Sequence, residues 1–367
     1  MKILQITPYY LPHTGGIERY VYNLSQYLIS KGHTVDIATA NVPESNTKET
    51  IDGTTIYRYP QLCTLMGNPI ITNLSDLKRR LKDYDIIHIH GVYTYAALRT
   101  VLFLGKKHKQ KVLLTHHGRV VYPNSPKNIL AKIYERIVVR FILRRLDCTI
   151  VLSESDKEQF MSLGMPGDKI NIIPNGIDTN AFVQPDAEVM TYFTEKYHLN
   201  RKKVILFLAV LSERKGIFDL LHAYALMQDE ETVLLIVGNG PDKEKAKELS
   251  LELNLSETVT FAGKLPFIEI LCAYARADTY VLPSYFEGMP TTVMEALVMG
   301  CPVVATSIPG VKDNFADEAV LVDPGNIRQL SDAIRKSLSE THEIDTNTLR
   351  RKYDAKKVFE KYSRIYT

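Results

Sequence analysis

The most informative stretch of this chain runs from residue 284 to residue 297 and reads SYFEGMPTTVMEAL. It follows an apolar run, residues 279–283, that predicts a strand, and Pro290 suits the first turn of a helix. A helix that starts there leaves three backbone amides without helical partners at the positive end of its dipole, those of Thr291, Thr292 and Val293. The stretch therefore predicts a strand–loop–helix unit of a parallel sheet, with a helix start that can bind a phosphate.

Two glutamates flank this helix start, Glu287 on the loop and Glu295 about one turn inside the helix. A carboxylate accepts two hydroxyl hydrogen bonds at once, which suits the diol of a sugar or of a ribose. We predict that each glutamate serves one of these diols. The alternative is an ordinary helix start with Glu295 on a solvated face. The loop residues Gly288, Met289 and Pro290 complete the expected ligand site.

A second cluster, Arg214 and Lys215, follows another expected strand, residues 204–210. Cations next to a helix start oppose the helix dipole, so helix stability explains them poorly, whereas a bound diphosphate explains them well. The alternative is a solvated turn whose charges serve solubility.

A third cluster, Gly15 and Gly16, lies between the first expected strand and helix, where glycines let a backbone approach a ligand closely. It is not a dinucleotide fingerprint, because the G-x-G-x-x-G pattern is absent. His88 and His90 share one face of a strand, so a metal site has to be considered. No cysteine or carboxylate at the strand ends completes a ligand set, and we predict no metal.

Short apolar runs alternate with longer helical patterns along the whole chain, which is the rhythm of doubly wound parallel sheets. The expected strands are residues 3–7, 34–39, 54–59, 86–90, 112–116, 149–153, 204–210, 233–237, 259–262, 279–283, 302–305 and 320–322. The expected helices are residues 16–30, 74–82, 95–107, 127–145, 154–163, 217–227, 242–253, 268–276, 291–299 and 327–338. A turn-rich segment, residues 172–178, separates the two alternations. We predict an α/β protein with two Rossmann-like domains facing a central cleft.

The composition fits this organisation, because 367 residues with 45% hydrophobic and 24% charged residues suit about two globular domains. The four cysteines lie far apart without a C-x-x-C pair, which favours a reducing compartment. No apolar segment of signal-peptide type follows Met1, and the longest apolar run, residues 204–211, is much shorter than the roughly 18 residues of a membrane span. We expect a cytoplasmic protein whose membrane contact, if any, is peripheral.

The formal net charge of +3 hides an asymmetry between the two halves of the chain. Residues 1–183 hold 23 Lys and Arg against 15 Asp and Glu, whereas the remainder holds 22 against 27. The basic residues of the first half form three groups: Lys78, Arg79, Arg80 and Lys82; Lys106, Lys107, Lys109 and Lys111; and Lys132, Arg136, Arg140 and Arg144. We predict an anionic membrane surface on the inner face of the cytoplasmic membrane as a partner. A solvated face is the alternative, and no nucleic-acid-reading motif is present.

These residues together resemble the family 4 retaining glycosyltransferases, which have the GT-B fold. The resemblance spans nearly the whole chain and rests on Gly15-Gly16-Ile17-Glu18, Thr115-His116-His117-Gly118, Ile173-Pro174-Asn175-Gly176-Ile177-Asp178, Lys215-Gly216, Val237-Gly238-Asn239-Gly240-Pro241 and the Glu287/Glu295 pair. It implies an acceptor-binding domain over residues 1–180 and a nucleotide-sugar-binding domain over residues 181–353. The helical tail, residues 354–367, would pack back on the first domain.

The resemblance also implies roles for single residues. Gly16 would contact the donor phosphates and His117 the donor sugar, while Lys215 would bind the diphosphate. Glu287 would bind the sugar hydroxyls and Glu295 the ribose. The implied reaction moves a hexose from a UDP- or GDP-sugar to the hydroxyl of a sugar, lipid-linked or other acceptor, with retention of configuration and without a metal or cofactor.

The chain departs from this family at one position. The family usually has Gly-Arg five to six residues before the lysine, with the arginine directed at the diphosphate, but here Ala209 and Val210 stand there. We expect Arg214 to replace the missing arginine; if it does not, donor turnover is in doubt.

Three rival functions stay open from the sequence. A nonhydrolysing nucleotide-sugar epimerase would have a similar two-domain shape. A catalytically silent nucleotide-sugar-binding protein is supported only by Val210. A glycosidase using Glu287 and Glu295 would leave the phosphate-binding features without a purpose.

Overall fold

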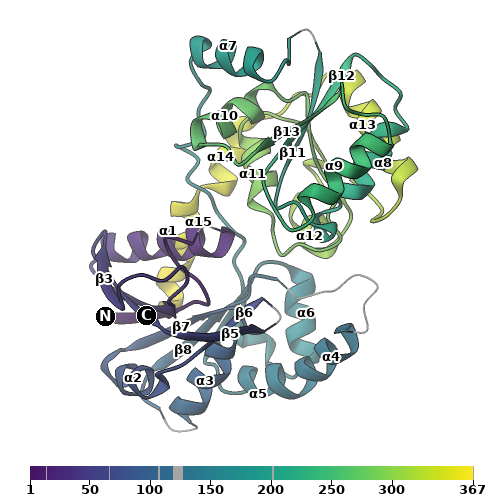
Figure 1. The fold of residues 1–367 in the computed structure, drawn as a ribbon. Helices are drawn as coiled ribbons and strands as arrows, with labels where there is room; N and C mark the ends of the chain where they lie inside the picture. The colour runs from purple at the N-terminus through teal and green to yellow at the C-terminus, as the bar shows by residue number, and fades with distance from the viewer. Residues whose placement is uncertain (14, 66, 106–107, 119–126, 201, 367) are drawn as a thin grey trace. The chain divides into compact units, whose positions relative to one another are not determined.

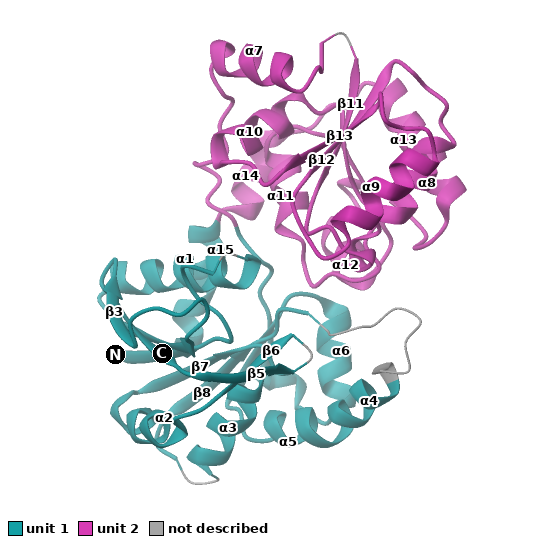
Figure 2. Cartoon of the chain, in the orientation of Figure 1, with its two compact units in different colours: residues 1–176, 355–367 teal, residues 177–354 magenta. Residues whose placement is uncertain are grey.

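The computed structural model describes residues 1–13, 15–65, 67–105, 108–118, 127–200 and 202–366 (Figure 1). The chain divides into two compact units, residues 1–176 with 355–367, and residues 177–354 (Figure 2). Each unit is built on a parallel sheet covered by helices, so the predicted α/β class with two Rossmann-like halves is confirmed.

Unit 1 contains an eight-stranded sheet with the order β10-β9-β8-β7-β1-β2-β4-β3, and only β3 runs antiparallel to its neighbour. Its strands are β1 (Lys2–Ile6), β2 (Thr34–Ala40), β3 (Lys48–Ile51), β4 (Thr54–Tyr59), β7 (Ile86–His90), β8 (Lys111–Thr115), β9 (Cys148–Val151) and β10 (Ile170–Ile172). A separate antiparallel pair is formed by β5 (Gln61–Leu65) and β6 (Asn68–Ile71). The strand order reverses between β1 and β7, which is where a doubly wound sheet binds its ligand.

Two apolar cores cover the two faces of this sheet. One core contains residues of α2 (Leu74–Arg80), α3 (Tyr95–Leu104), α5 (Arg140–Leu143) and α6 (Glu154–Ser162). The other contains residues of α1 (Gly16–Ser30) and α15 (Ala355–Tyr366), which share buried aromatic side chains. The last helix of the chain is therefore part of the core of unit 1, although the preceding residues belong to unit 2.

Unit 2 contains a six-stranded parallel sheet with the order β13-β12-β11-β14-β15-β16. Its strands are β11 (Lys203–Leu208), β12 (Thr232–Val237), β13 (Val259–Gly263), β14 (Thr279–Leu282), β15 (Val303–Thr306) and β16 (Ala319–Val322). Its helices are α7 (Ala187–Lys196), α8 (Ile217–Ala225), α9 (Lys243–Glu252), α10 (Phe267–Arg276), α11 (Thr291–Val298), α12 (Pro309–Phe315), α13 (Ile327–Ser339) and α14 (Thr346–Tyr353). The order reverses between β11 and β14, so the loops that follow these two strands mark the expected ligand site.

The structure adds elements that the sequence pattern did not predict. These are the strands β3, β5, β6 and β10 and the helices α7, α12 and α14. Short peripheral elements bury little of their surface: β3 reads Lys-Glu-Thr-Ile and β5 is mostly exposed. Such short elements give no clear periodic pattern, because hydrophobic periodicity reports burial rather than hydrogen bonding.

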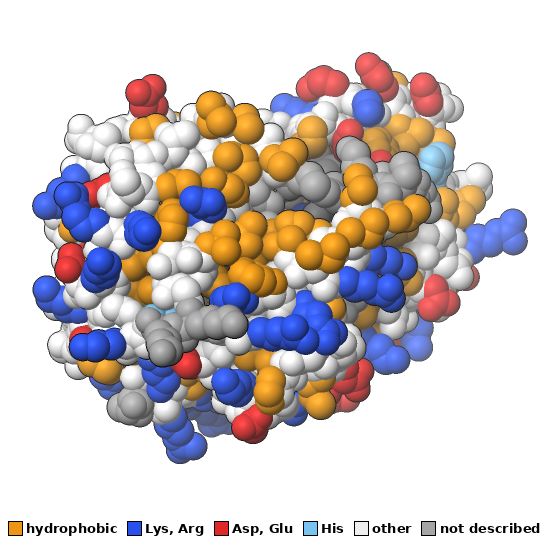
Figure 3. Space-filling view, turned by 90° about the horizontal axis from the view of Figure 1, so that it is seen from below, with side chains coloured by type: hydrophobic (Ala, Val, Ile, Leu, Met, Phe, Trp, Pro, Cys, Tyr) orange, Lys and Arg blue, Asp and Glu red, His pale blue; other side chains and the backbone are white. Residues whose placement is uncertain are grey.

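The helix predicted over residues 127–145 is broken into three segments. These are α4 (Lys127–Tyr134), a π-helical turn η2 (Glu135–Val139) and α5. Large aliphatic side chains remain exposed along this segment, namely Ile129, Leu130, Ile133 and Ile137. Figure 3 shows a face of the molecule on which hydrophobic side chains gather, with Lys and Arg side chains along their border.

Candidate active site

The loops after β11 and β14 bring the basic and acidic residues of the two strongest motifs together in unit 2. The first loop leads into a short helical turn, η4 (Glu213–Lys215), and the second leads into α11. Gly216, with φ +74°, lets η4 pass against the second loop, because a Cβ there would lie 2.0 Å from the carbonyl oxygen of Pro283. The two motifs therefore form one site at the point where the strand order reverses.

The centre of this site is an ion pair between Lys215 and Glu287. Lys215 Nζ lies 2.5 Å from Glu287 Oε1, and the Ser284 hydroxyl donates to the same oxygen at 2.6 Å. The side chains of Lys215 and Glu287 are only 14% and 8% exposed, and Ser284 is fully buried. Two donors thus fix the Glu287 carboxylate, and this carboxylate balances the lysine charge.

Arg214 ties the two loops to each other. Its Nη1 donates to the carbonyl oxygen of Phe286 at 2.9 Å, and its own carbonyl oxygen accepts from the amide of Tyr285 at 2.9 Å. Val210, which stands where the family has an arginine, is 53% exposed. A longer side chain at that position has room to extend.

The start of α11 agrees with the prediction, since the helix begins at Thr291 after Pro290 as its N-cap. Within the described residues no side chain caps this start, so its amides suit an external anion. The preceding residues are packed: Met289 is 5% exposed, and the Tyr280 hydroxyl donates to Thr292 Oγ1 at 2.7 Å. Buried side chains therefore fix the backbone around the predicted phosphate-binding turn.

Glu295 is buried, with 4% of its surface exposed. The Tyr274 hydroxyl of α10 donates to its Oε2 at 2.9 Å. The alternative of a solvated Glu295 is therefore wrong. Sequence reasoning missed Tyr274, because a tyrosine within an apolar helical pattern gives no sign that its hydroxyl holds a carboxylate.

A glycine of α12 was also missed. A Cβ on Gly310 would lie 2.0 Å from the carbonyl oxygen of Gly288 and 2.3 Å from that of Glu287. The start of α12 therefore packs against the backbone that carries Glu287. This glycine is needed because a loop distant in the sequence passes close to it in the folded chain, and the sequence does not reveal that distance.

Unit 1 holds the remaining predicted residues near its own point of strand reversal. Gly15 is the N-cap of α1 and Gly16 its first residue. The Glu18 carboxylate lies back over Gly15 and pairs with His13, with Nδ1 of His13 3.2 Å from Oε1 of Glu18. Burial raises the pKa of Glu18 above its usual value.

His117 follows β8 and lies beside His90, with His117 Nε2 3.1 Å from His90 Nδ1. Its ring also packs edge-on against Tyr20 of α1. Burial, and secondarily the neighbouring His116, lower the pKa of His117 to about 3. His117 is therefore neutral at physiological pH.

The histidines of β7 are fully engaged by protein groups. His88 has Tyr366 at one ring nitrogen and Thr115 at the other, at 2.6 and 2.8 Å. His90 has His117 and Gln5 in the same way. Every one of these ring nitrogens already has a hydrogen-bond partner, so the structure gives no support for a metal site at His88 and His90.

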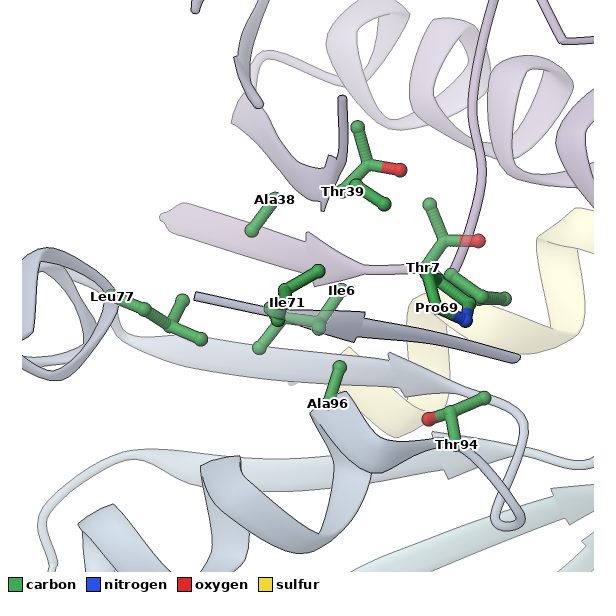
Figure 4. A pocket seen from close by; sticks show the side chains of 11 residues that line it. Ile6, Thr7, Ala38, Thr39, Pro69, Ile71, Leu77, Thr94 and Ala96 are labelled. Carbon is green, nitrogen blue, oxygen red and sulfur yellow. The ribbon is translucent and has the colours of Figure 1, made fainter. Parts of the chain in front are cut away.

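A small pocket lies where β1 and β2 end, beside β6 and the start of α3 (Figure 4). Its walls are mostly apolar, with Thr7, Thr39 and Thr94 as the polar members. Its volume is about 10 Å³, which matches one water molecule at most. This pocket is too small for a sugar.

Two family models match the chain, one in each half. The model of the glycosyl transferases group 1 matches residues 191–357, and the model of glycosyltransferase family 4 matches residues 14–181. An uncharacterized glycosyltransferase of Methanocaldococcus jannaschii is 27% identical over 99% of this chain and 95% of its own. A GDP-mannose-dependent phosphatidylinositol monomannoside mannosyltransferase of Mycolicibacterium smegmatis is 26% identical over 92% of this chain and 89% of its own.

Solved structures show the same fold. Sucrose-phosphate synthase of Thermosynechococcus elongatus has a TM-score of 0.81 and 20% identity over 100% of this chain and 98% of its own. Anabaena HepE in complex with UDP-glucose has a TM-score of 0.80 and 16% identity over 100% and 99%. The family models and the shared fold thus define a glycosyltransferase of the GT-B class. Within that class, the chain belongs to the group 1, family 4 type of glycosyltransferases.

Proposed function

We propose that this glycosyltransferase moves a hexose from a UDP- or GDP-sugar to an acceptor hydroxyl with retention of configuration. The meeting of Arg214, Lys215 and Glu287 on the loop that leads into α11 carries the proposal. It provides cations and free amides for a diphosphate beside a fixed carboxylate for sugar hydroxyls. The UDP-glucose complex of HepE, which shares the fold, supports a nucleotide-sugar donor.

The site suits a reaction in which the leaving diphosphate acts as the base. The bond from the anomeric carbon to the diphosphate breaks, and the acceptor oxygen attaches on the same face. The acceptor proton passes to a phosphate oxygen of the leaving group. Lys215, Arg214 and the α11 amides would stabilise the developing charge, which is the part that a metal takes in other enzymes.

Glu287 suits a binding role better than a nucleophilic one. Its Oε1 accepts from both Lys215 and Ser284, so the carboxylate is held in one orientation by two donors. We assign it to the sugar hydroxyls and buried Glu295 to the ribose. In unit 1, we assign Gly15 and Gly16 to the donor phosphates and His117 to the donor sugar.

The decisive experiment incubates the purified protein with UDP- and GDP-sugars, with and without a panel of hydroxyl acceptors. A transferase forms a new glycoside only when acceptor is present, and the coupling constant of the anomeric proton reports retention or inversion. Interconversion of the sugar without acceptor would favour the epimerase. Tight binding without turnover across the panel would favour the silent binding protein. Unchanged activity in a chelator is the expected result for a metal-independent reaction.

For the acceptor, we propose a lipid-linked hydroxyl reached from an anionic membrane surface. The segment α4–η2–α5 carries Ile129, Leu130, Ile133 and Ile137, which are 64%, 63%, 50% and 66% exposed. It also carries Arg136 and Arg140, and Arg144 follows it as the C-cap of α5; none of these three has a side-chain partner among the described residues. Exposed aliphatic groups beside unpaired arginines are typical of a helix that lies in a membrane interface.

The other basic groups fit this role less well. Arg79 and Arg80 both pair with Asp76 at 2.6 Å, and the Arg80 guanidinium lies over the Tyr57 ring. Lys106 and Lys107 lie outside the described residues. We therefore place the proposed membrane surface at the third group, Lys132, Arg136, Arg140 and Arg144.

A cavity of about 770 Å³ lies beside α5 and is lined by these arginines. Its walls include Arg136, Arg140, Arg144, Arg145 and Lys169. Such a site suits lipid phosphates. Among the described residues, no helix is long and apolar enough to cross a membrane. The names of two relatives, the mannosyltransferase above and a phosphatidylinositol N-acetylglucosaminyltransferase subunit of Arabidopsis thaliana, give lipids as their acceptors and support the same proposal.

A further inference from the structure

A directional chain of hydrogen bonds runs through the core of unit 1 and ends at His117. It starts on α1, where the Ser25 hydroxyl donates to the carbonyl oxygen of Val21 at 2.7 Å. The Gln5 amide on β1 donates to Ser25 Oγ at 2.7 Å. His90 on β7 then joins Gln5 Oε1 through Nε2 at 2.8 Å and His117 through Nδ1 at 3.1 Å.

The direction of each bond follows from the first one. Because the Ser25 proton is used on Val21, Ser25 Oγ can only accept from Gln5, which places the Gln5 NH₂ group toward Ser25. Gln5 Oε1 then faces His90 and can only accept, so His90 Nε2 carries a proton. The hydrogen bond of Ser25 thus determines the orientation of the Gln5 amide, and through it the tautomer of His90.

The same reasoning continues to His117. A neutral His90 protonated at Nε2 has a bare Nδ1, which must accept from His117 Nε2. Both histidines are held neutral, since burial lowers the pKa of His90 well below its usual value and that of His117 to about 3. Nδ1 of His117 is left bare, and it has no hydrogen-bond partner among the described residues.

We propose that Gln5 and His90 are positioning residues that hold His117 in the tautomer with an unprotonated Nδ1, so that this atom only accepts hydrogen bonds. The group that it can recognise is a hydroxyl or an amide N–H of a ligand. An unprotonated Nδ1 cannot form a hydrogen bond with an ionised phosphate oxygen, because neither atom carries a proton. The assignment of His117 to the donor sugar rests on the proposed function, whereas the tautomer does not.

The proposal distinguishes two roles that His117 could have in sugar transfer. A proton donor at this position would help a leaving group, and an acceptor would select a sugar by one of its hydroxyls. The chain of bonds assigns the second role. His117 is thus a specificity-determining residue whose selectivity is set by two buried residues behind it.

Long-range ¹H–¹⁵N spectra of protein labelled with ¹⁵N-histidine test the tautomer directly. For wild type we expect His117 with a protonated Nε2 and a bare Nδ1, which a His117→Gln variant assigns. In Gln5→Leu the acceptor for His90 is lost, so the His117 signals should move toward a mixture of tautomers. Ser25→Ala frees the Gln5 amide to rotate and provides a second, milder variant if Gln5→Leu does not fold.

Thr115→Val is the matched control. Thr115 is equally buried on the same sheet but bonds His88 rather than His90, so its loss should leave the His117 signals in place. A wild-type His117 with a protonated Nδ1 would overturn the proposal. So would an unchanged His117 spectrum in both Gln5→Leu and Ser25→Ala.

Titration with UDP, UDP-glucose and GDP-mannose separates this result from the proposed function. A nucleotide sugar, but not UDP alone, should shift the bare Nδ1 signal, and the affinity for that sugar should fall about two- to tenfold in Gln5→Leu, as for one lost hydrogen bond. If the wild-type tautomer is as expected but no sugar moves the Nδ1 signal, the assignment of His117 to the donor fails and the positioning role stands.

Discussion

Glu295 offers the sharpest test at the scale of single residues. It is a buried carboxylate held by Tyr274, and we assign it to the ribose diol of the donor. We expect Glu295→Ala to weaken donor affinity about ten- to a hundredfold, because a hydrogen bond to a charged group is worth about 1.5–3 kcal/mol. Isothermal titration with the nucleoside diphosphate measures it. Tyr274→Phe, which keeps the carboxylate, should cost less, and unchanged affinity in Glu295→Ala would remove Glu295 from the site.

The missing family arginine leads to a second prediction. Arg214 holds the loop of Phe286 and has further guanidinium N–H groups for a diphosphate. We expect Arg214→Ala to lower donor affinity about as much as Lys215→Ala, because each removes a cation from the site.

The Val210→Arg change separates the two parts that Arg214 plays. If Arg214 acts on the diphosphate, adding this substitution to Arg214→Ala should recover part of the affinity, since Val210 is exposed and has room for the longer side chain. If Arg214 only holds the loop, a cation at position 210 restores nothing. Dissociation constants of the single and double variants decide between these roles.

Acid stability follows from the buried histidines of unit 1. Burial lowers the pKa of His88 and of His117 to about 3, whereas an unfolded histidine titrates near 6.5. Between these values the unfolded chain binds more protons than the folded one. Stability is therefore complete above about pH 6.5 and falls as the pH drops, by about 1.4 kcal/mol per pH unit for each histidine.

Urea denaturation from pH 7 to pH 5 measures this loss. A His88→Asn variant should be less stable at pH 7, because it breaks the bonds to Tyr366 and Thr115, but its stability should depend less on pH. Equal slopes for both proteins would contradict the burial of a neutral His88.

For single residues, the sequence allowed a prediction where a functional group lies within a short motif. Glu287, Lys215 and the start of α11 could be placed together because both motifs follow parallel strands, whose carboxyl ends share one edge of a sheet. Ser284, Tyr274 and Gly310 could not, since their importance depends on distances between segments that only the folded chain brings together.

At the scale of elements, α15 gives the clearest prediction. Deleting residues 355–367 removes the buried side chains of Val358, Phe359, Tyr362, Ile365 and Tyr366 from the core of unit 1. Each is worth about 1.5–3 kcal/mol, so the total is comparable to the about 5–15 kcal/mol that stabilises a whole domain. We expect the truncated protein to lose the cooperative unfolding transition of unit 1 in calorimetry. Lys357→Ala, an exposed position of the same helix, is the control and should leave this transition unchanged.

The periodic elements were predictable and the irregular ones were not. The strands of both central sheets carry continuous buried apolar runs, which the sequence displays plainly. The helical pattern of residues 127–145 is also visible, but nothing in it indicates the π-helical turn Glu135–Val139. The hydrophobic pattern of α15 did not predict which unit the helix packs against, because an amphipathic helix can complete either core.

At the scale of the whole molecule, the asymmetry of charge leads to the prediction that the protein binds an anionic surface. The basic half of the chain contains the α4–η2–α5 segment, where Arg136 and Arg140 have no side-chain partner in the described part of the chain and several aliphatic side chains are exposed. We expect the protein to sediment with anionic vesicles of phosphatidylglycerol and phosphatidylcholine, but not with phosphatidylcholine alone. Because the arginines contribute about 1 kcal/mol each near such a surface, sedimentation should weaken as salt is added.

Two sets of variants separate this segment from the net charge. Replacing Arg136, Arg140 and Arg144 by Glu should abolish sedimentation, whereas the same replacement of Lys243, Lys245 and Lys247 on α9 changes the net charge equally and should not. Ile133→Asp and Ile137→Asp should reduce binding at low and high salt alike, since they remove insertion rather than attraction. Equal losses in the arginine and lysine sets would reduce the interaction to net charge, and a wild type that stays in solution with anionic vesicles at low salt would leave the segment as a solvated face.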